Sequence, residues 1–230
     1  MPGLLRTSFL DYPGKICATL FLTGCPFRCP FCHNPDLVFG EDPHDIDWPS
    51  FIDFLDTRKD VLDGICITGG EPLLHFDVLL RYLPQIKGKG FLIKLDTNGY
   101  FPKELESLLK NSLVDYVAMD IKSSLEKYEK VTGVIGIDID RIKNSINIIK
   151  AKANDYEFRT TVLPEFYSSE DALEIGQLLK EAKRYTLQQF SANRDMIDPS
   201  YKNKQQFKEK DFNVFKKILN PYIKEVNLPL

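Results

Sequence analysis

Residues 16–34 read ICATLFLTGCPFRCPFCHN, an apolar run followed by three closely spaced cysteines, Cys25, Cys29 and Cys32. The run at 16–22 predicts a β-strand, and the cysteine segment predicts a loop at its carboxyl end. Thiolates are the usual ligands of iron–sulfur clusters, so three of them on one loop indicate such a centre. A cubane of four irons would keep one iron without a protein ligand, and a substrate or cofactor could bind there.

Outward from this segment, strand-like runs alternate with helical patterns. The further runs lie at residues 64–68, 91–96, 116–121, 157–163 and 185–190. Apolar residues recur at helical spacing at Ile139, Ile142, Ile146 and Ile149. Two further stretches with this spacing follow Ser168 and begin at Trp48. Six successive β-then-α units predict a parallel sheet with right-handed crossovers. They are too few for an eight-fold barrel, so we expect an α/β fold with a partial, open (β/α)6 barrel of the TIM type.

The 230 residues, 43% of them hydrophobic, predict one domain. We expect residues 1–200 to form the barrel. Residues 201–230 should add a polar loop and a C-terminal packing helix to the same domain, because Phe212, Phe215, Ile218, Leu219 and Tyr222 recur at helical spacing. A net charge of −3 offers no electrostatic case for a nucleic-acid partner. No apolar stretch is long enough for a membrane span and no leader is evident, so a cytoplasmic location is expected.

The five cysteines of the chain are an odd number, and no secretion signal accompanies them. Both facts argue against a disulfide framework. A structural zinc site is the alternative to a cluster, but zinc usually takes four ligands from two pairs, and a second pair is missing. Cys17 and Cys66 fall inside predicted strands, where free cysteine commonly acts as a small buried hydrophobe.

Polar segments follow the predicted strands at residues 24–32, 69–72, 96–99 and 120–122. In parallel barrels, function gathers at the carboxyl ends of the strands, so these segments define the candidate site. Each has a plainer explanation. The glycine-containing segments are also turn sequences, Asp120 and Lys122 share one face of a strand and could form a simple salt bridge, and Arg159 could partner a buried carboxylate.

The pattern Cys-x3-Cys-x2-Cys, with the aromatic Phe31 before the last cysteine, resembles the signature of the radical S-adenosylmethionine (SAM) superfamily. Residues 11–15 (DYPGK) and 32–35 (CHNP) are similar to the activating enzymes of glycyl radical enzymes, above all those of anaerobic ribonucleoside-triphosphate reductase. The likeness extends from about residue 5 to residue 190. The resemblance implies one [4Fe–4S] cluster on the catalytic and metal-binding residues Cys25, Cys29 and Cys32, because no second cysteine-rich insertion follows.

The resemblance also implies residues that bind SAM. They are Gly69, Gly70 and Glu71, whose carboxylate would meet the SAM ammonium group, with Asn98, Asp120, Lys122, Arg159 and, against the adenine, Phe31. Core packing is the alternative for Phe31. Asp96, Thr97 and Asp120 match positions that hold a monovalent cation in the pyruvate formate-lyase activator. Ser191 departs from that activator, which has a histidine there, so histidine contacts are not carried over.

The chemistry implied is reductive cleavage of SAM to methionine and a 5′-deoxyadenosyl radical. The electron would come from a flavodoxin- or ferredoxin-type donor. The radical would take hydrogen from a glycine Cα of a partner glycyl radical enzyme. Anaerobic ribonucleotide reductase is the partner that the resemblance favours most. Alternatives are activation of pyruvate formate-lyase, action on a small molecule, or a non-catalytic zinc- or RNA-binding module. The last would need a fourth metal ligand and a basic stripe, and neither is evident in the sequence.

Overall fold

The computed structural model describes residues 3–40, 47–193 and 195–229. Its strands are β1 (Leu4–Ser8), β2 (Cys17–Leu22), β3 (Gly64–Gly69), β4 (Leu92–Thr97), β5 (Tyr116–Asp120), β6 (Asp155–Val162), β7 (Arg184–Gln189) and β8 (Glu225–Asn227). Its α-helices are α1 (Pro35–Phe39), α2 (Trp48–Asp56), α3 (Phe76–Gly88), α4 (Pro102–Lys110), α5 (Tyr128–Thr132), α6 (Ile139–Lys152), α7 (Ser169–Leu178) and α8 (Glu209–Leu219). Short 3-10 helices are η2 (Pro72–His75), η3 (Leu125–Lys127) and η4 (Pro199–Asn203).

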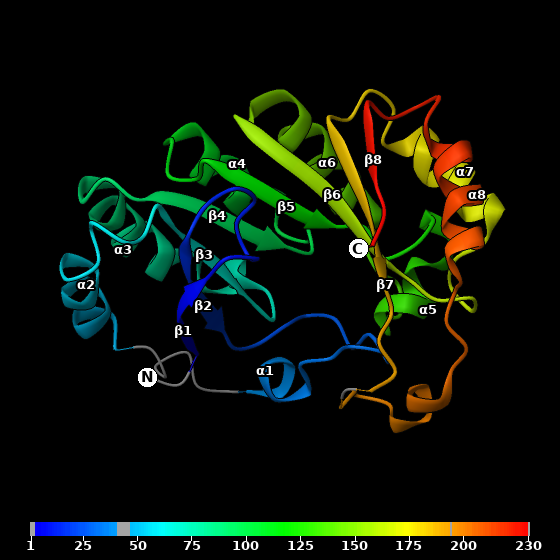
Figure 1. Cartoon of the computed structure of the whole chain (residues 1–230), viewed down its shortest axis with the longest axis horizontal. Coiled ribbons are helices and arrows are strands. Elements are labelled where there is room, and N and C mark those ends of the chain that lie inside the picture. The colour runs from blue at the N-terminus through cyan, green and yellow to red at the C-terminus, as the bar shows by residue number, and fades with distance from the viewer. Residues whose placement is uncertain (1–2, 41–46, 194, 230) are drawn as a thin grey trace.

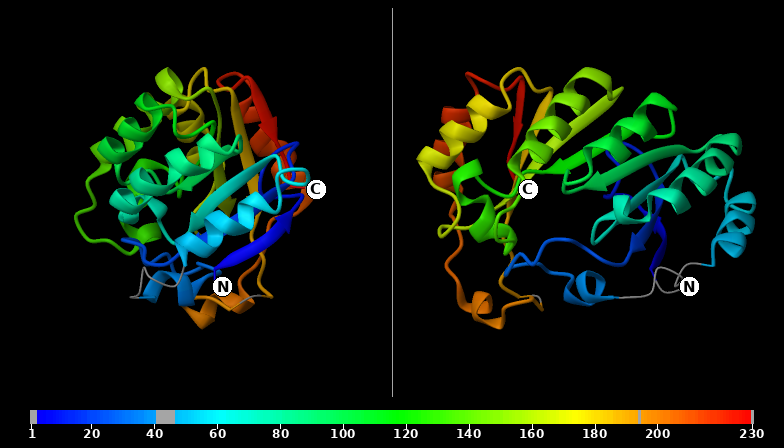
Figure 2. Two further views of the ribbon diagram at one scale, coloured as in Figure 1. Left: turned by 90° about the vertical axis from the view of Figure 1, so that its left-hand side faces the viewer. Right: turned by 180° about the vertical axis from the view of Figure 1, so that it is seen from behind.

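The strands form one sheet in sequence order, from β1 at one edge to β8 at the other. Strands β2 to β8 run parallel, and β1 is antiparallel to β2. The sheet curves around an interior space, and helices such as α3, α4, α6 and α7 cover its outer side (Figure 1; Figure 2). This arrangement confirms the predicted partial, open barrel, and β2 to β7 are the six predicted strands with slightly shifted ends.

The two edge strands, β1 and β8, are absent from the sequence prediction. Both are short, and β8 has three residues, too few for an alternating pattern to be recognised. Helix α8 confirms the predicted packing helix, but it ends at Leu219, so Tyr222 lies beyond it in the turn before β8. Among the described residues, no helix combines the length and apolar character that a membrane crossing requires.

Side chains of the central strands alternate between two environments. One set packs with the covering helices in the main apolar cluster: Ile65, Ile67, Ile93, Leu95, Val117 and Met119 from the strands, and Leu83, Ile142, Ile146 and Ile175 from the helices. The intervening positions face the interior, as the two-residue period of a strand requires. Near the amino ends of the strands this interior is filled by Tyr12, Cys17, Cys66, Tyr116 and Ala118. Cys17 and Cys66 are fully buried there, as predicted.

Phe215 on α8 provides a test of the packing between the C-terminal helix and the barrel. Phe215 is 4% exposed and belongs to the main apolar cluster, whereas its neighbour Val214 is 48% exposed. We expect Phe215→Ala to lower the free energy of unfolding by about 3–5 kcal/mol. The matched control Val214→Ala should change it by no more than about 0.5 kcal/mol. Urea denaturation measures both, and equal effects would contradict this packing.

Candidate active site

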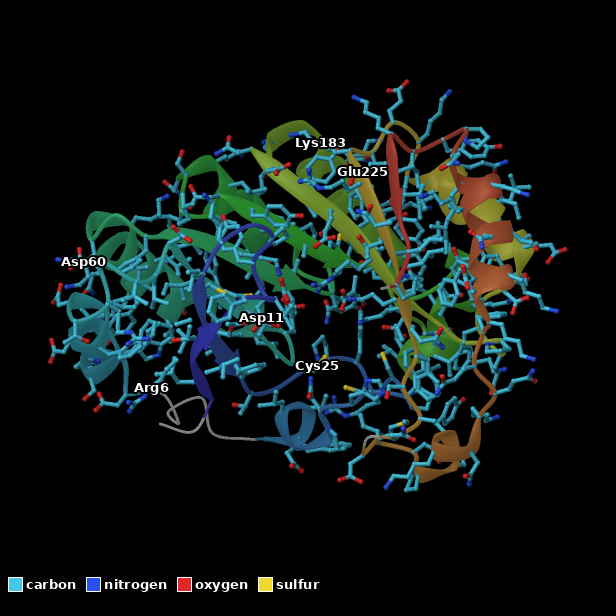
Figure 3. All side chains as sticks on the ribbon, viewed as in Figure 1. Arg6, Asp11, Cys25, Asp60, Lys183 and Glu225 are labelled. Carbon is cyan, nitrogen blue, oxygen red and sulfur yellow. The ribbon has the colours of Figure 1, made fainter. Side chains whose placement is uncertain are left out.

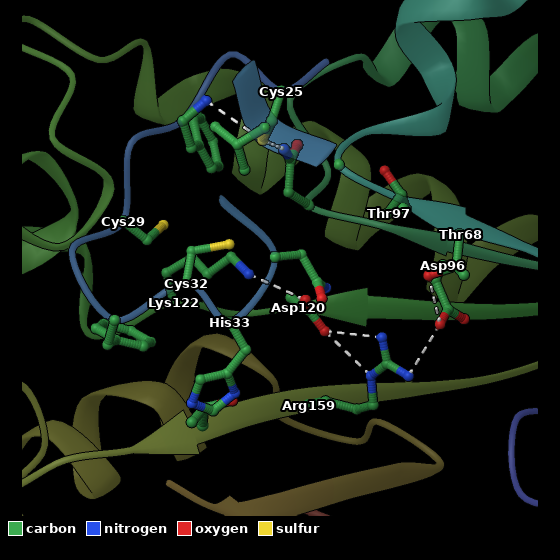
Figure 4. A pocket seen from close by; sticks show the side chains of 18 residues that line it. Cys25, Cys29, Cys32, His33, Thr68, Asp96, Thr97, Asp120, Lys122 and Arg159 are labelled. Atoms are coloured by element: carbon green, nitrogen blue, oxygen red, sulfur yellow. Dashed lines mark hydrogen bonds and ion pairs between the residues drawn. The ribbon is translucent and has the colours of Figure 1, made fainter. Parts of the chain in front are cut away.

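A cavity of about 190 Å³ lies at the carboxyl ends of the parallel strands. Predicted site residues that line it are Cys25, Cys29, Phe31, Cys32, Gly69, Gly70, Asn98, Asp120, Lys122 and Arg159. Asp96 and Thr97, predicted as cation ligands, line it as well. Glu71 does not. Figure 3 shows side chains over the whole ribbon, and Figure 4 shows those that line the cavity.

The cysteine loop follows β2 and is tied to its surroundings by backbone hydrogen bonds. Gly24 N donates to Leu37 O at 2.6 Å, and Arg28 N donates to Thr132 O at 2.7 Å. Within the loop, Cys32 N donates to Cys29 O at 3.0 Å. These bonds hold the loop against α1 and α5, so the three thiols face one cavity.

Burial raises the pKa of the Cys25 thiol to about 11 and that of Cys29 to about 12. Metal binding would therefore have to displace their protons, as it does at any thiolate site. Three soft sulfur donors on one cavity fit an iron–sulfur cluster. Within the described part of the chain, no group of three His, Cys, Asp or Glu side chains is placed to hold a metal ion. In a cubane each cysteine binds a different iron, so its ligands need not converge on one point.

Gly69 and Gly70 let β3 approach the cysteine loop. A Cβ atom on Gly70 would lie 2.1 Å from Gly24 O, and one on Gly69 would lie 2.1 Å from Leu22 O. Gly69 also has a φ of 127°, a value that disfavours any side chain. The two glycines are thus required by the close contact between the end of β3 and the chain that carries the cysteines. The sequence alone did not reveal this requirement.

Glu71 is fully buried and connects three segments of the site. Its backbone N donates to Gly24 O at 2.8 Å. Its carboxylate accepts from Asn98 N at 2.6 Å, Thr97 Oγ1 at 2.9 Å and Leu73 N at 3.0 Å. Asn98 Nδ2 in turn donates to Cys25 Sγ at 3.7 Å. The structure therefore engages this carboxylate within the protein and does not bring it to the cavity, where its predicted contact with the SAM ammonium group would occur.

Charged side chains form a continuous network along one wall (Figure 4). Arg159 Nη2 donates to Asp120 Oδ1 at 2.9 Å, and Arg159 Nη1 donates to Asp96 Oδ2 at 3.3 Å. Lys122 Nζ donates to Asp120 Oδ2 at 3.0 Å. Burial alone would raise the pKa of Asp120, but Lys122 and Arg159 lower it to about 2. The salt bridges considered from the sequence are thus present, and they lie on the cavity itself.

Phe31 borders both the cavity and a second apolar cluster. Its ring centroid lies 5.6 Å from that of Phe166 and 6.3 Å from that of Tyr201. The core-packing alternative is therefore realised, while contact with adenine stays a prediction.

The sequence analysis assigned no individual role to several residues that line the cavity: Phe27, His33, Asn34, Val38, Thr68 and Thr161. Thr68 and Thr161 could have been found from the two-residue period of a strand: Thr68 stands two residues before Gly70, and Thr161 stands two residues after Arg159. His33 Nε2 lies 2.9 Å from Ser191 O, a contact between residues 158 positions apart. No local pattern could have indicated it.

Comparisons with known proteins identify the relatives of this chain. The family model described as "Radical SAM superfamily" matches residues 19–179. A Methanocaldococcus jannaschii protein named "Putative glycyl-radical enzyme activating enzyme MJ1227" is 36% identical over 232 residues, covering 97% of this chain and 93% of its own length. The pyruvate formate-lyase-activating enzyme of Clostridium pasteurianum is 33% identical over 129 residues, or 54% of this chain and 53% of the relative.

Solved structures show the same fold. Streptococcus suis SuiB bound to S-adenosylmethionine aligns with a TM-score of 0.67 at 18% identity, over 92% of this chain and 49% of that one. The structure "Native anSMEcpe with bound AdoMet" aligns with a TM-score of 0.57 at 14% identity, over 87% of this chain and 58% of that one. The chain thus spans about half the length of SuiB and of the pyruvate formate-lyase-activating enzyme.

The fold and the site together define an α/β enzyme of the partial-barrel class with a cysteine-lined cavity at its strand ends. The matches over most of its length place it more narrowly. The chain belongs to the radical SAM superfamily, in the group of the glycyl-radical enzyme activating enzymes. Membership implies a [4Fe–4S] cluster and SAM as cofactors.

Gly70→Ala tests the contact between β3 and the cysteine loop. The added methyl group would meet Gly24 O, so the loop must shift. We expect a loss of stability of about 1–3 kcal/mol and a marked drop in iron bound after anaerobic reconstitution. Gly88→Ala is the matched control, because its Cβ meets nothing within 4 Å. Iron and sulfide analysis measures the result, and equal iron in both variants would argue against the proposed constraint.

Glu71 predicts a pH dependence of the apo-protein's stability. Burial raises its pKa from 4.5 to about 7, so the folded state keeps a proton that the unfolded state has already released. The free energy of unfolding should therefore fall as pH rises from about 4.5 to about 7. The contribution is on the order of 1.4 kcal/mol per pH unit.

Glu71→Gln should flatten that slope, since an amide does not titrate. Glu170→Gln is the control, because hydrogen bonding to Ser168 lowers the pKa of this exposed carboxyl and it titrates below the same window. Urea denaturation at several pH values checks both variants. A slope that survives Glu71→Gln would show that another group is responsible.

Proposed function

We propose that this enzyme generates a glycyl radical on a partner enzyme, and that the partner is anaerobic ribonucleoside-triphosphate reductase. The observation that carries the proposal is the meeting of three free thiols and a charged wall in one cavity. That cavity belongs to a chain similar over nearly its whole length to a protein named as a glycyl-radical enzyme activating enzyme. The reductase is favoured by the DYPGK and CHNP segments. A cytoplasmic location and a flavodoxin- or ferredoxin-type donor belong to the same proposal.

The residues of the cavity have separate tasks in this proposal. Cys25, Cys29 and Cys32 hold the cluster, and SAM binds beside them. When bound, the cluster and SAM supply the one-electron chemistry that yields a carbon-centred radical. The backbone of Gly69 and Gly70, with Asn98, would hold the methionine end of SAM. Phe31 would pack against the adenine.

Charge and shape would orient the ligand. SAM carries a carboxylate, which Lys122 and Arg159 attract from the wall of the cavity. Asp120, kept ionised by these two cations, holds their side chains against the wall where SAM would bind. Strand ends and the cysteine loop line the cavity, and exclusion of water by a bound ligand would strengthen each of these interactions.

The open barrel offers a route for the partner's glycine. Strands β1 and β8 are the two edges of the sheet, and the sheet order does not join them. A loop of a large partner could reach the cavity between these edges, which a closed barrel would forbid.

A second candidate partner is pyruvate formate-lyase. It is favoured by the 33% identity with the pyruvate formate-lyase-activating enzyme, although that match covers 54% of this chain. Action on a small molecule is the third possibility. A non-catalytic zinc-binding module is set aside, because membership of the radical SAM superfamily makes the chain an enzyme.

The proposal is tested by electron paramagnetic resonance (EPR). The protein is reconstituted anaerobically with iron and sulfide, reduced, and mixed with SAM and either candidate partner. We expect 5′-deoxyadenosine and a glycyl radical doublet with the reductase. Cys29→Ser should abolish both signals, whereas Cys17→Ser, a buried cysteine outside the cavity, should retain them.

Each other outcome decides between the candidates. A doublet with pyruvate formate-lyase alone would transfer the proposal to that partner. Cleavage of SAM with no protein radical on either partner would favour a small-molecule substrate. A protein that takes up no iron would contradict the function altogether.

A further inference from the structure

The monovalent cation site expected from Asp96, Thr97 and Asp120 does not fit the structure, because their oxygens already have partners. Asp96 forms an ion pair with Lys94, and its other oxygen accepts from Thr68 Oγ1 and Arg159 Nη1, both at 3.3 Å. Thr97 Oγ1 donates to Glu71 at 2.9 Å and accepts from Gly99 N at 3.1 Å. Asp120 is held by Lys122 and Arg159, as described above. A free cation would have to displace these bonds.

Lys94 is the unexpected member of this group. It lies two residues before Asp96 on β4, so both side chains face the barrel interior. Its side chain is 2% exposed. Across the sheet, β3 places Cys66 directly opposite Lys94, and Lys94 Nζ lies 3.7 Å from Cys66 Sγ. The ammonium group is thus enclosed below the cavity, with Asp96 as its carboxylate.

The charges around the two carboxylates leave no need for a further cation. Asp96 and Asp120 carry two negative charges, and Lys94, Lys122 and Arg159 carry three positive ones. An added K⁺ or Na⁺ would be repelled by ammonium and guanidinium groups at close range, where little water screens them. Among these five groups the cations outnumber the carboxylates by one, and that charge would complement the carboxylate of SAM.

We propose that Lys94 takes the place of the monovalent cation. Its ammonium group holds Asp96, Asp96 holds Arg159, and Arg159 holds Asp120 at the cavity wall, so SAM binds without K⁺ or Na⁺. This inference rests on the cavity being the SAM site. Lys94 acts through Asp96 and is therefore a positioning residue.

The first test uses the reconstituted wild-type protein. The Kd for SAM is measured by anaerobic equilibrium dialysis in KCl, NaCl and tetramethylammonium chloride at equal ionic strength. The tetramethylammonium ion is too large to enter a small oxygen-lined site. We expect the three Kd values to agree within about twofold, since Lys94 supplies the charge in each. A Kd roughly tenfold weaker in tetramethylammonium alone would overturn the proposal.

The second test removes the ammonium group. Lys94→Met keeps most of the side-chain volume, and we expect SAM affinity in tetramethylammonium to fall roughly tenfold, the scale of a lost charge-assisted hydrogen bond. K⁺ or Na⁺ should then restore most of the loss, because the space beside Asp96 becomes available to a cation. A merely structural role for Lys94 would weaken SAM binding equally in all three salts, and that result would contradict the proposal.

Lys87→Met is the matched control. Lys87 Nζ pairs with Asp115 at 2.7 and 2.8 Å, outside the cavity lining, so its loss removes a lysine–aspartate pair without touching the site. Its SAM affinity should match the wild type in every salt. Should Lys94→Met fail to fold, the wild-type Kd values in the three salts still decide whether SAM binding needs K⁺ or Na⁺.

Failure of the proposed function is distinguishable from failure of this inference. SAM binding is measured without a partner, and it is followed independently by the change that SAM causes in the EPR spectrum of the reduced cluster. A protein that binds SAM in all three salts but activates neither partner would disprove the activation proposal and support the role of Lys94.

Discussion

A buried carboxylate, Glu71, organises the cavity. Its backbone forms a hydrogen bond with the start of the cysteine loop, and its side chain forms hydrogen bonds with the end of β4. The side chain of Asn98 then forms a hydrogen bond with Cys25. Hydrogen bonds to a buried carboxyl group are strong in the low dielectric of an interior, and each one left unmade would be costly. The positions of the cysteine loop, β3 and β4 therefore depend on one another. The cavity forms where the hydrogen bonds of all three segments are made together.

The second constraint is electrostatic. A network of five charged side chains inside a barrel is stable only when each charge has a partner. Here carboxylates and cations alternate along the wall, from Lys122 through Asp120, Arg159 and Asp96 to Lys94. Such a network resists rearrangement, which suits a site that must present fixed charges to a ligand. Buried ionic networks are better suited to fixing geometry than to adding stability, and this one lies where geometry matters most.

Strand alternation explains how one sheet carries both a stable core and a reactive cavity. The residues facing the helices are apolar and are held in the main cluster. Those facing the interior include the cluster of Tyr12, Cys17, Cys66, Tyr116 and Ala118 near the amino ends and the charged side chains of the cavity near the carboxyl ends. A shift of one residue in any strand would exchange the two sets, so the apolar packing outside also determines which side chains reach the cavity.

The sequence by itself determined the class of fold, the six central strands, the cysteine motif and most of the residues on the cavity. These depend on local periodicity and on spacings short enough to be read along the chain, and the family resemblance added the identity of the cofactors. Tertiary structure alone decided the rest. It places the Glu71 side chain in hydrogen bonds outside the cavity, and it brings Gly70 against the cysteine loop. It also makes β1 and β8 the edges of the sheet and places the ammonium group of Lys94 next to Asp96. Each of these depends on groups brought together from different strands, and a pairing between distant segments leaves no periodic signal in either of them.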